Sequence, residues 1–91
     1  MGINLITFKI MPDTVDVDLD DVEEKARGLI EDFGGNIIKS EKEPVAFGLM
    51  ALSISFSLDE SYSNLDTLED QLRNIEGVIS AEVVDVRRAV G

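Results

Sequence analysis

The side chains that most often carry out catalysis are missing from this chain. It contains no histidine and no cysteine, which removes the commonest acid–base group, the thiol nucleophile and zinc–thiolate chemistry. Carboxylates could bind Mg²⁺ or Ca²⁺, and Asp16, Asp18 and Asp20 alternate along the chain. That segment lacks the glycine and the distal glutamate of a calcium-binding loop. We therefore expect no covalent chemistry, no metal site and no cofactor.

A phenylalanine beside a proline turn is the first residue that could recognise a partner. Pro44 fixes its own φ and donates no hydrogen bond, which suits a turn or the start of a strand. Phe47 follows within the same apolar run. If it is exposed, it forms an apolar wedge for a partner protein. In the alternative, a β-bulge at Gly48 returns Phe47 to the core.

Two adjacent arginines are the second such feature. Arg87 and Arg88 are half of the arginines in the chain and lie beside a predicted strand end in an otherwise acidic molecule. The pair could enter an anion-binding site of another protein. In the alternative, one of them pairs with Glu82 or Asp85 and keeps the strand end soluble. We expect residues 87–91 to form a mobile tail in the absence of a partner.

Length and charge limit the classes of partner. The 91 residues predict one domain over positions 1–91, and no apolar segment is long enough to span a bilayer. We expect a soluble, cytoplasmic protein. The net charge of −11 disfavours direct binding to nucleic acid or to an anionic membrane and favours a basic protein partner. Solubility, or adaptation to salt or heat, would also explain the excess of acidic residues.

Hydrophobic periodicity predicts a strand and then a helix in the first part of the chain. Residues 5–11 alternate between apolar and polar side chains, which is typical of a strand. Asp18 suits the N-cap of a helix, and Gly34 suits its end. The apolar stripe of this helix is predicted to be Leu19, Val22, Ala26, Leu29 and Phe33.

Residues 36–43 predict a short edge strand, and Pro44 then leads into a long central strand that runs to Leu58. Strict alternation along this strand places two sets of side chains on opposite faces. The first set is Gly48, Met50, Leu52, Ile54, Phe56 and Leu58, and the second is Phe47, Leu49, Ala51, Ser53, Ser55 and Ser57. The serines mark the second face as exposed to water.

The remaining residues predict a second helix and a last strand. Ser63 or Asn64 suits the N-cap, and Gly77 suits the end of the helix. The last strand covers 78–86, with a bulge or a register change near Val83 because its apolar residues switch parity there. The order strand, helix, strand, strand, helix, strand predicts an α+β ferredoxin-like sandwich with a four-stranded antiparallel sheet and two helices on one face.

Three stretches of the sequence together resemble the archaeal translation elongation factor 1-beta family along the whole chain. The most specific is the P-V-A-F-G-L motif formed by Pro44, Val45, Ala46, Phe47, Gly48 and Leu49. The others are residues 8–12 with 15–19, near the start of the sequence, and residues 75–78 with 84–88, near its end. The family is similar to the catalytic domain of the eukaryotic elongation factor 1B alpha subunit, a guanine nucleotide exchange factor with a ferredoxin-like fold.

This resemblance implies a function and a set of site residues. The chain would release GDP from archaeal elongation factor 1-alpha, the GTPase that delivers aminoacyl-tRNA. Phe47 would be the wedge, with the rest of the P-V-A-F-G-L motif binding the partner. Arg88 or Arg87 would correspond to the lysine that reaches the magnesium site in the eukaryotic domain. Met50 replaces another lysine of the eukaryotic motif, so that charge is absent.

Two rival functions fit the same predicted fold. A small-molecule-binding regulatory domain would hold a ligand at a helix N-terminus or across a dimer interface. An acylphosphatase-like enzyme is disfavoured because residues 11–17 contain no arginine and no glycine-rich phosphate cradle. Oligomeric state separates the main alternatives, since we expect an exchange domain to act as a monomer.

Overall fold

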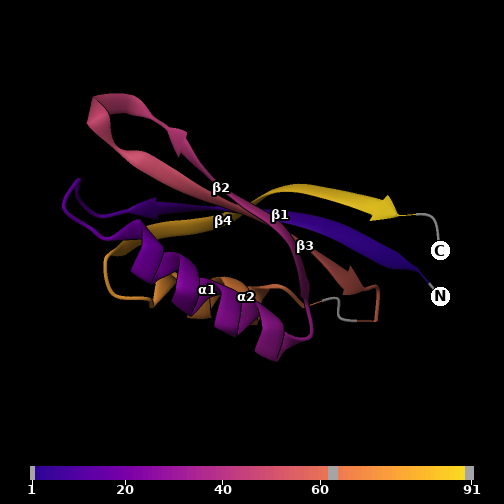
Figure 1. Cartoon of the computed structure of the whole chain (residues 1–91). Coiled ribbons are helices and arrows are strands. Elements are labelled where there is room, and N and C mark those ends of the chain that lie inside the picture. Colours follow the sequence, from indigo (N-terminus) through magenta and orange to yellow (C-terminus); the bar gives the residue numbers. More distant parts are fainter. Residues whose placement is uncertain (1, 62–63, 90–91) are drawn as a thin grey trace.

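The computed structural model describes residues 2–61 and 64–89 of the chain. Within them the chain forms a four-stranded sheet and two α-helices (Figure 1). The elements in chain order are β1 (Ile3–Pro12), α1 (Leu19–Phe33), β2 (Asn36–Pro44), the short 3₁₀ helix η1 (Ala46–Gly48), β3 (Met50–Asp59), α2 (Asp66–Arg73) and β4 (Val78–Ala89).

The predicted ferredoxin-like fold is confirmed. The strand order is β2-β3-β1-β4, every neighbouring pair is antiparallel, and both helices cover the same face of the sheet (Figure 1). The edge position predicted for the second strand is also correct, because β2 pairs only with β3 among the described residues. The central strands β1 and β3 therefore carry the core.

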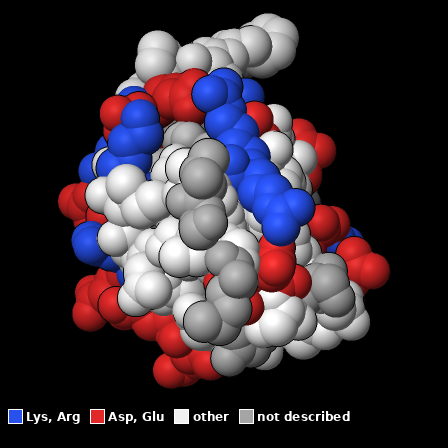
Figure 2. All heavy atoms as spheres, turned by 90° about the vertical axis from the view of Figure 1, so that its right-hand side faces the viewer, with Lys and Arg blue, Asp and Glu red and all other residues white. Residues whose placement is uncertain are grey.

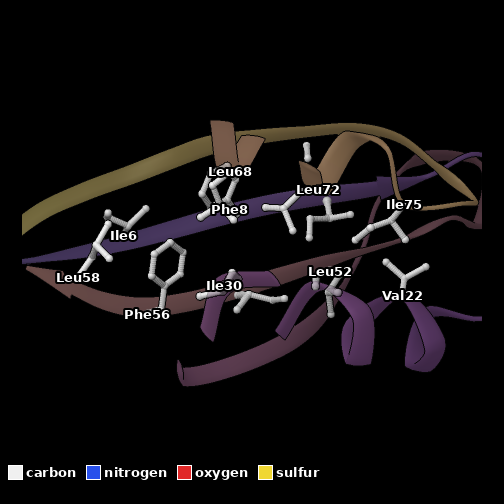
Figure 3. Packing of buried hydrophobic residues seen from close by; sticks show 14 residues of the cluster. Ile6, Phe8, Val22, Ile30, Leu52, Phe56, Leu58, Leu68, Leu72 and Ile75 are labelled. Carbon is white, nitrogen blue, oxygen red and sulfur yellow. The ribbon is translucent and has the colours of Figure 1, made fainter. Parts of the chain in front are cut away.

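The core lies between the sheet and the helices. Phe8 of β1 and Phe56 of β3 are completely buried, and their rings stack with centroids 5.9 Å apart (Figure 3). Burying each large apolar side chain contributes about 1.5–3 kcal/mol to the free energy of unfolding. The buried set is completed by Ile6, Ile10, Val22, Ala26, Ile30, Leu52, Ile54, Leu58, Leu68, Leu72, Ile75 and Ala81.

The helix ends follow the local sequence signals. The carboxylate of Asp18 accepts hydrogen bonds from the backbone N–H groups of Asp20 and Asp21, and Gly34 takes the left-handed conformation that ends α1. One detail of the predicted stripe is wrong. Ile30, rather than Leu29, is the completely buried residue of the last turns, and Leu29 packs at the margin of the core.

The second helix begins close to its predicted cap, but its predicted end is wrong. The Asn64 side chain accepts a hydrogen bond from the backbone N–H of Asp66 at 3.1 Å. The N-cap position itself is Leu65, which makes no side-chain cap hydrogen bond. The alternative cap, Ser63, lies outside the described residues. The prediction that Gly77 ends this helix is wrong, because α2 ends at Arg73 with Asn74 as its C-cap in right-handed conformation. Gly77 does have positive φ, 92°, but it lies in the turn that leads into β4.

The bulge predicted in the last strand is confirmed, and the strand is longer than predicted. Thr7 pairs with Asp85 and Phe8 pairs with Val83, so the register skips one residue of β4, as the switch in apolar parity indicated. Beyond the bulge, β4 continues to Ala89. Arg87 and Arg88 therefore belong to the sheet, and the expectation that they form a mobile tail is wrong. The rest of that segment, 90–91, lies outside the described residues.

Candidate functional site

The loop that joins β2 to β3 presents Phe47 at its tip. The backbone N–H of Leu49 donates to the carbonyl of Ala46 at 3.3 Å, and that of Val45 donates to the carbonyl of Leu49 at 2.8 Å. Phe47 and Gly48, the two central residues of this turn, have φ values of 61° and 75°. Positive φ at both central positions is the feature of a type I′ hairpin turn, which normally carries asparagine or glycine.

Phe47 is 94% exposed, so a β-bulge does not return it to the core. The predicted strand alternation is wrong for Phe47 and Gly48, because β3 begins only at Met50 and the preceding residues form the turn. From Leu52 onward the predicted faces are correct. The phenyl ring therefore stands on the hairpin tip and not on the open face of the sheet.

The backbone conformation of Phe47 is costly for the fold. A residue other than glycine in the left-handed region lowers the free energy of unfolding by roughly 1–2 kcal/mol, because its Cβ lies too close to the following carbonyl oxygen. Phe47 is the only such residue in the described chain. An apolar ring that is both exposed and held by strained backbone is typical of a contact surface rather than of the core.

The other residues of the motif form the base of this tip. Pro44 ends β2 and pairs with Met50, so it sits at the turn as predicted. Val45 and Leu49 are half-buried, whereas Ala46 and Gly48 are exposed. The motif therefore builds a short apolar loop on two partly anchored residues, with the ring of Phe47 projecting from it.

A second loop lies beside the hairpin. Val15, in the loop between β1 and α1, is 64% exposed and helps to line an open hollow of about 170 Å³ with Gly48 and Met50. Sequence reasoning missed Val15. An apolar residue within an acidic run is the only signal, and nothing local shows that this loop meets the hairpin.

An ion pair connects the hairpin to the first helix. Lys42 of β2 donates to the carboxylate of Asp20 at the start of α1. The hydrogen bond to Asp20 raises the pKa of Lys42 above its usual value of 10.5. The pair joins α1 to the strand that carries the Phe47 turn.

The paired arginines lie at the end of β4. Arg87 donates from Nε to Oδ2 of Asp85 at 3.0 Å, which confirms the predicted alternative that one arginine pairs with a neighbouring carboxylate. Arg88 donates to Oε2 of Glu60 at 2.8 Å. Figure 2 views this end of the molecule and shows basic side chains lying directly against acidic ones.

The structure does not bring Phe47 and Arg88 together. Pro44 pairs with Met50 at one end of the sheet, whereas Leu58 and Arg88 flank the same residue of β1, Asn4, at the other end. The eight residue steps from Met50 to Leu58 span about 27 Å of extended chain. Figure 1 shows the hairpin and the end of β4 at opposite ends of the sheet. A partner that contacts both Phe47 and Arg88 must therefore bind this chain at both ends of the sheet.

Within the described residues no group of acidic side chains is arranged to hold a metal ion. None of the helices there is long and apolar enough to cross a membrane.

Comparison with known proteins identifies the family. The model of the EF-1 guanine nucleotide exchange domain matches residues 5–89. The chain belongs to this family. Its relatives include elongation factor 1-beta of Methanothermobacter thermautotrophicus, 38% identical over 97% of this chain and 98% of the relative. Elongation factor 1-beta of Thermococcus onnurineus is 44% identical over 93% of this chain and 94% of the relative.

Solved structures support the same fold. The ACT domain of GTP pyrophosphokinase from Chlorobium tepidum superposes with a TM-score of 0.60 and 22% identity, covering 88% of this chain and 96% of that domain. At this identity the likeness concerns the fold alone. The function comes from the family: the chain is a guanine nucleotide exchange factor of translation elongation, and not an enzyme that makes or breaks covalent bonds.

Proposed function

We propose that this chain releases GDP from archaeal elongation factor 1-alpha by contacting it with both ends of the sheet. Phe47 is the wedge at one end, and Arg88, with Arg87 beside it, supplies the cation at the other. The loop residues Pro44, Val45, Ala46, Gly48 and Leu49 hold the wedge against the partner. Residues 1–91 act as one exchange domain, as a monomer in the cytoplasm, without a cofactor and without binding nucleic acid directly.

The exposure of Phe47 on a strained turn is the observation that carries this proposal. A large apolar ring at a hairpin tip stabilises a complex when it enters a pocket and leaves water. If the pocket forms only when neighbouring parts of the GTPase move apart, the binding energy of the ring favours the conformation that holds nucleotide weakly. Phe47 would thereby convert contact into release of GDP.

At the other end of the sheet, Arg88 acts through its positive charge on the nucleotide site of the GTPase. A GTPase holds GDP through its phosphate loop and a bound Mg²⁺, so a guanidinium that enters near the metal site competes with Mg²⁺ for the same anionic ligands. Arg88 can approach such ligands because its side chain is 72% exposed. Coupling is reciprocal, so a factor that binds the nucleotide-free GTPase more tightly must lower the affinity for nucleotide by the same ratio.

Release of a fluorescent GDP analogue from purified archaeal elongation factor 1-alpha tests this proposal. We expect the wild-type chain to accelerate release, and Phe47→Ala and Arg88→Ala each to lose about tenfold or more of that acceleration, the usual range for central contacts. Arg87→Ala shows how far the neighbouring arginine shares the role.

Ile38→Ala is the matched control, because Ile38 is 56% exposed on the edge strand β2 and lies away from both ends of the sheet. Its activity should stay within about twofold of wild type, as expected for an exposed apolar residue outside the contact. If the folded wild-type chain fails to accelerate release, the exchange proposal is wrong. If Ile38→Ala loses as much activity as Phe47→Ala, the assignment of the wedge is wrong.

A further inference from the structure

Glu60 and Arg88 form an ion pair across the end of the central strand β1. Glu60 follows β3, Arg88 lies on β4, and β1 separates these two strands in the sheet. The guanidinium of Arg88 donates to Oε2 of Glu60 at 2.8 Å, although 28 positions separate the two residues. The backbone N–H of Glu60 donates to the carbonyl of Gly2 at 3.1 Å, which fixes the backbone from which the carboxylate extends.

The ion pair lies directly over Gly2, where no side chain occupies the space. A Cβ added to Gly2 would lie 2.8 Å from Cδ of Glu60 and 3.1 Å from a terminal nitrogen of Arg88. The first distance is too short for two carbon atoms, so the carboxylate of Glu60 would have to move. Gly2, Glu60 and Arg88 therefore form one three-residue contact, with the glycine backbone beneath the two charged groups.

We propose that Glu60 is a positioning residue that occupies Arg88 in the free protein and releases it when the partner supplies a stronger anionic site. This inference rests on the proposed role of Arg88 in exchange. The carboxylate of Glu60 and the anionic nucleotide site of the GTPase are alternative acceptors for one guanidinium. Arg88 must give up the first to reach the second, so Glu60 lowers the rate at which exchange begins.

The neighbouring arginine provides the contrast. Arg87 pairs with Asp85 two positions earlier on the same strand, and residues 87 and 88 alternate between the two faces of the sheet. Glu60→Gln removes the charge that faces Arg88, whereas Asp85→Asn removes the charge that faces Arg87. Each substitution removes one negative charge, so the two variants differ in which arginine is released and have the same net charge.

Exchange kinetics of these two variants test the proposal. An exposed ion pair changes an equilibrium by up to about fivefold. We therefore expect Glu60→Gln to raise the apparent second-order rate of GDP release by about two- to fivefold at low salt, and the advantage to vanish at high salt because screening weakens the pair in wild type. Asp85→Asn should match wild type. In an Arg88→Ala background, Glu60→Gln should have no effect.

Gly2→Ala provides a second, charge-neutral variant. It displaces Glu60 while every charge remains, so it should accelerate release in the same direction as Glu60→Gln. A rate for Glu60→Gln that equals or falls below the wild-type rate would overturn the inference, and so would a Gly2→Ala rate below that of wild type. So would an equal acceleration by Asp85→Asn, because a general charge effect or the release of Arg87 would then be sufficient.

An NMR measurement on the free protein separates this inference from the exchange proposal. The resonances of the terminal guanidinium Nη–H groups of Arg88 should shift in Glu60→Gln and stay unchanged in Asp85→Asn. The Nε–Hε resonance of Arg87 should show the reverse pattern. If these shifts occur and the wild-type chain does not accelerate GDP release, the exchange proposal fails while the ion pair stands. If the Arg88 resonances do not respond to Glu60→Gln, the ion pair itself is absent.

Discussion

Phe47 combines two properties that are unfavourable for a folded monomer. Its ring is exposed to water and its backbone has positive φ, a conformation in which glycine is tolerated and a larger residue is strained. A sequence selected for stability alone would place glycine or asparagine at this position of the turn. Phenylalanine at this point is consistent with a contact to a partner that offsets the cost.

Replacing Phe47 by glycine or by alanine separates stability from function. Both substitutions remove the ring, so both should lose the acceleration of GDP release. Glycine also relieves the strained backbone, and Phe47→Gly should be more stable to unfolding than Phe47→Ala by about 1 kcal/mol. Thermal or denaturant unfolding of the two variants measures this difference. A glycine variant less stable than the alanine variant would show that the turn is not strained at this residue.

At the scale of secondary-structure elements, the β2–β3 hairpin determines where the ring of Phe47 is presented. Its turn depends on Gly48, whose φ is 75° and around which a Cβ would find open space. Any cost of a side chain at Gly48 is therefore conformational and not steric. Gly28 in α1 is the matched case, because it too has open space around it but has helical backbone.

Alanine substitutions at the two glycines should have opposite effects on stability. Gly48→Ala should lower the free energy of unfolding by about 1 kcal/mol and reduce exchange, because the turn that presents Phe47 must adjust. Gly28→Ala should raise stability by about 0.5–1 kcal/mol, since alanine favours a helix interior, and should leave exchange unchanged. Equal stability changes in the two variants would contradict the assigned turn conformation. Unfolding curves and the GDP-release assay provide both readouts.

The helices and the succession of strands and helices along the chain were predictable because their signals are local. Asp18 caps α1, and Leu68 and Leu72 of α2 fall in the core, where four-residue spacing places them. The turn at Phe47 was not predictable, since strand periodicity continues across it and phenylalanine gives no signal for positive φ. The acceptor of Arg88 is 28 positions away, which no periodicity reveals.

The whole molecule is an elongated acidic body with different contact groups at its two ends. Its principal extents are 42 × 21 × 17 Å, and the net charge is −11. Like charges over such a small surface repel one another, whereas the same field attracts a basic partner. Apolar contact at the hairpin and ionic contact at the end of β4 then act on the partner after the field has brought the two proteins together.

Salt should therefore change stability and exchange in opposite directions. Added salt screens the repulsion within the chain, so the melting temperature should rise. The apparent second-order rate of exchange should fall by about tenfold between low and high salt, because screening also weakens attraction to the partner. Scanning calorimetry and GDP-release kinetics over one salt series measure both trends. An exchange rate that does not depend on salt would remove electrostatic steering from the mechanism.

The two-ended contact is tested most directly by mixing two single variants in the GDP-release assay. If Phe47 and Arg88 act from one molecule on one GTPase, an equimolar mixture of Phe47→Ala and Arg88→Ala at saturating concentration should be no faster than the more active variant alone. A mixture that restores the wild-type rate would contradict this mechanism, because the two residues could then act from separate molecules and the length of the sheet between them would have no role.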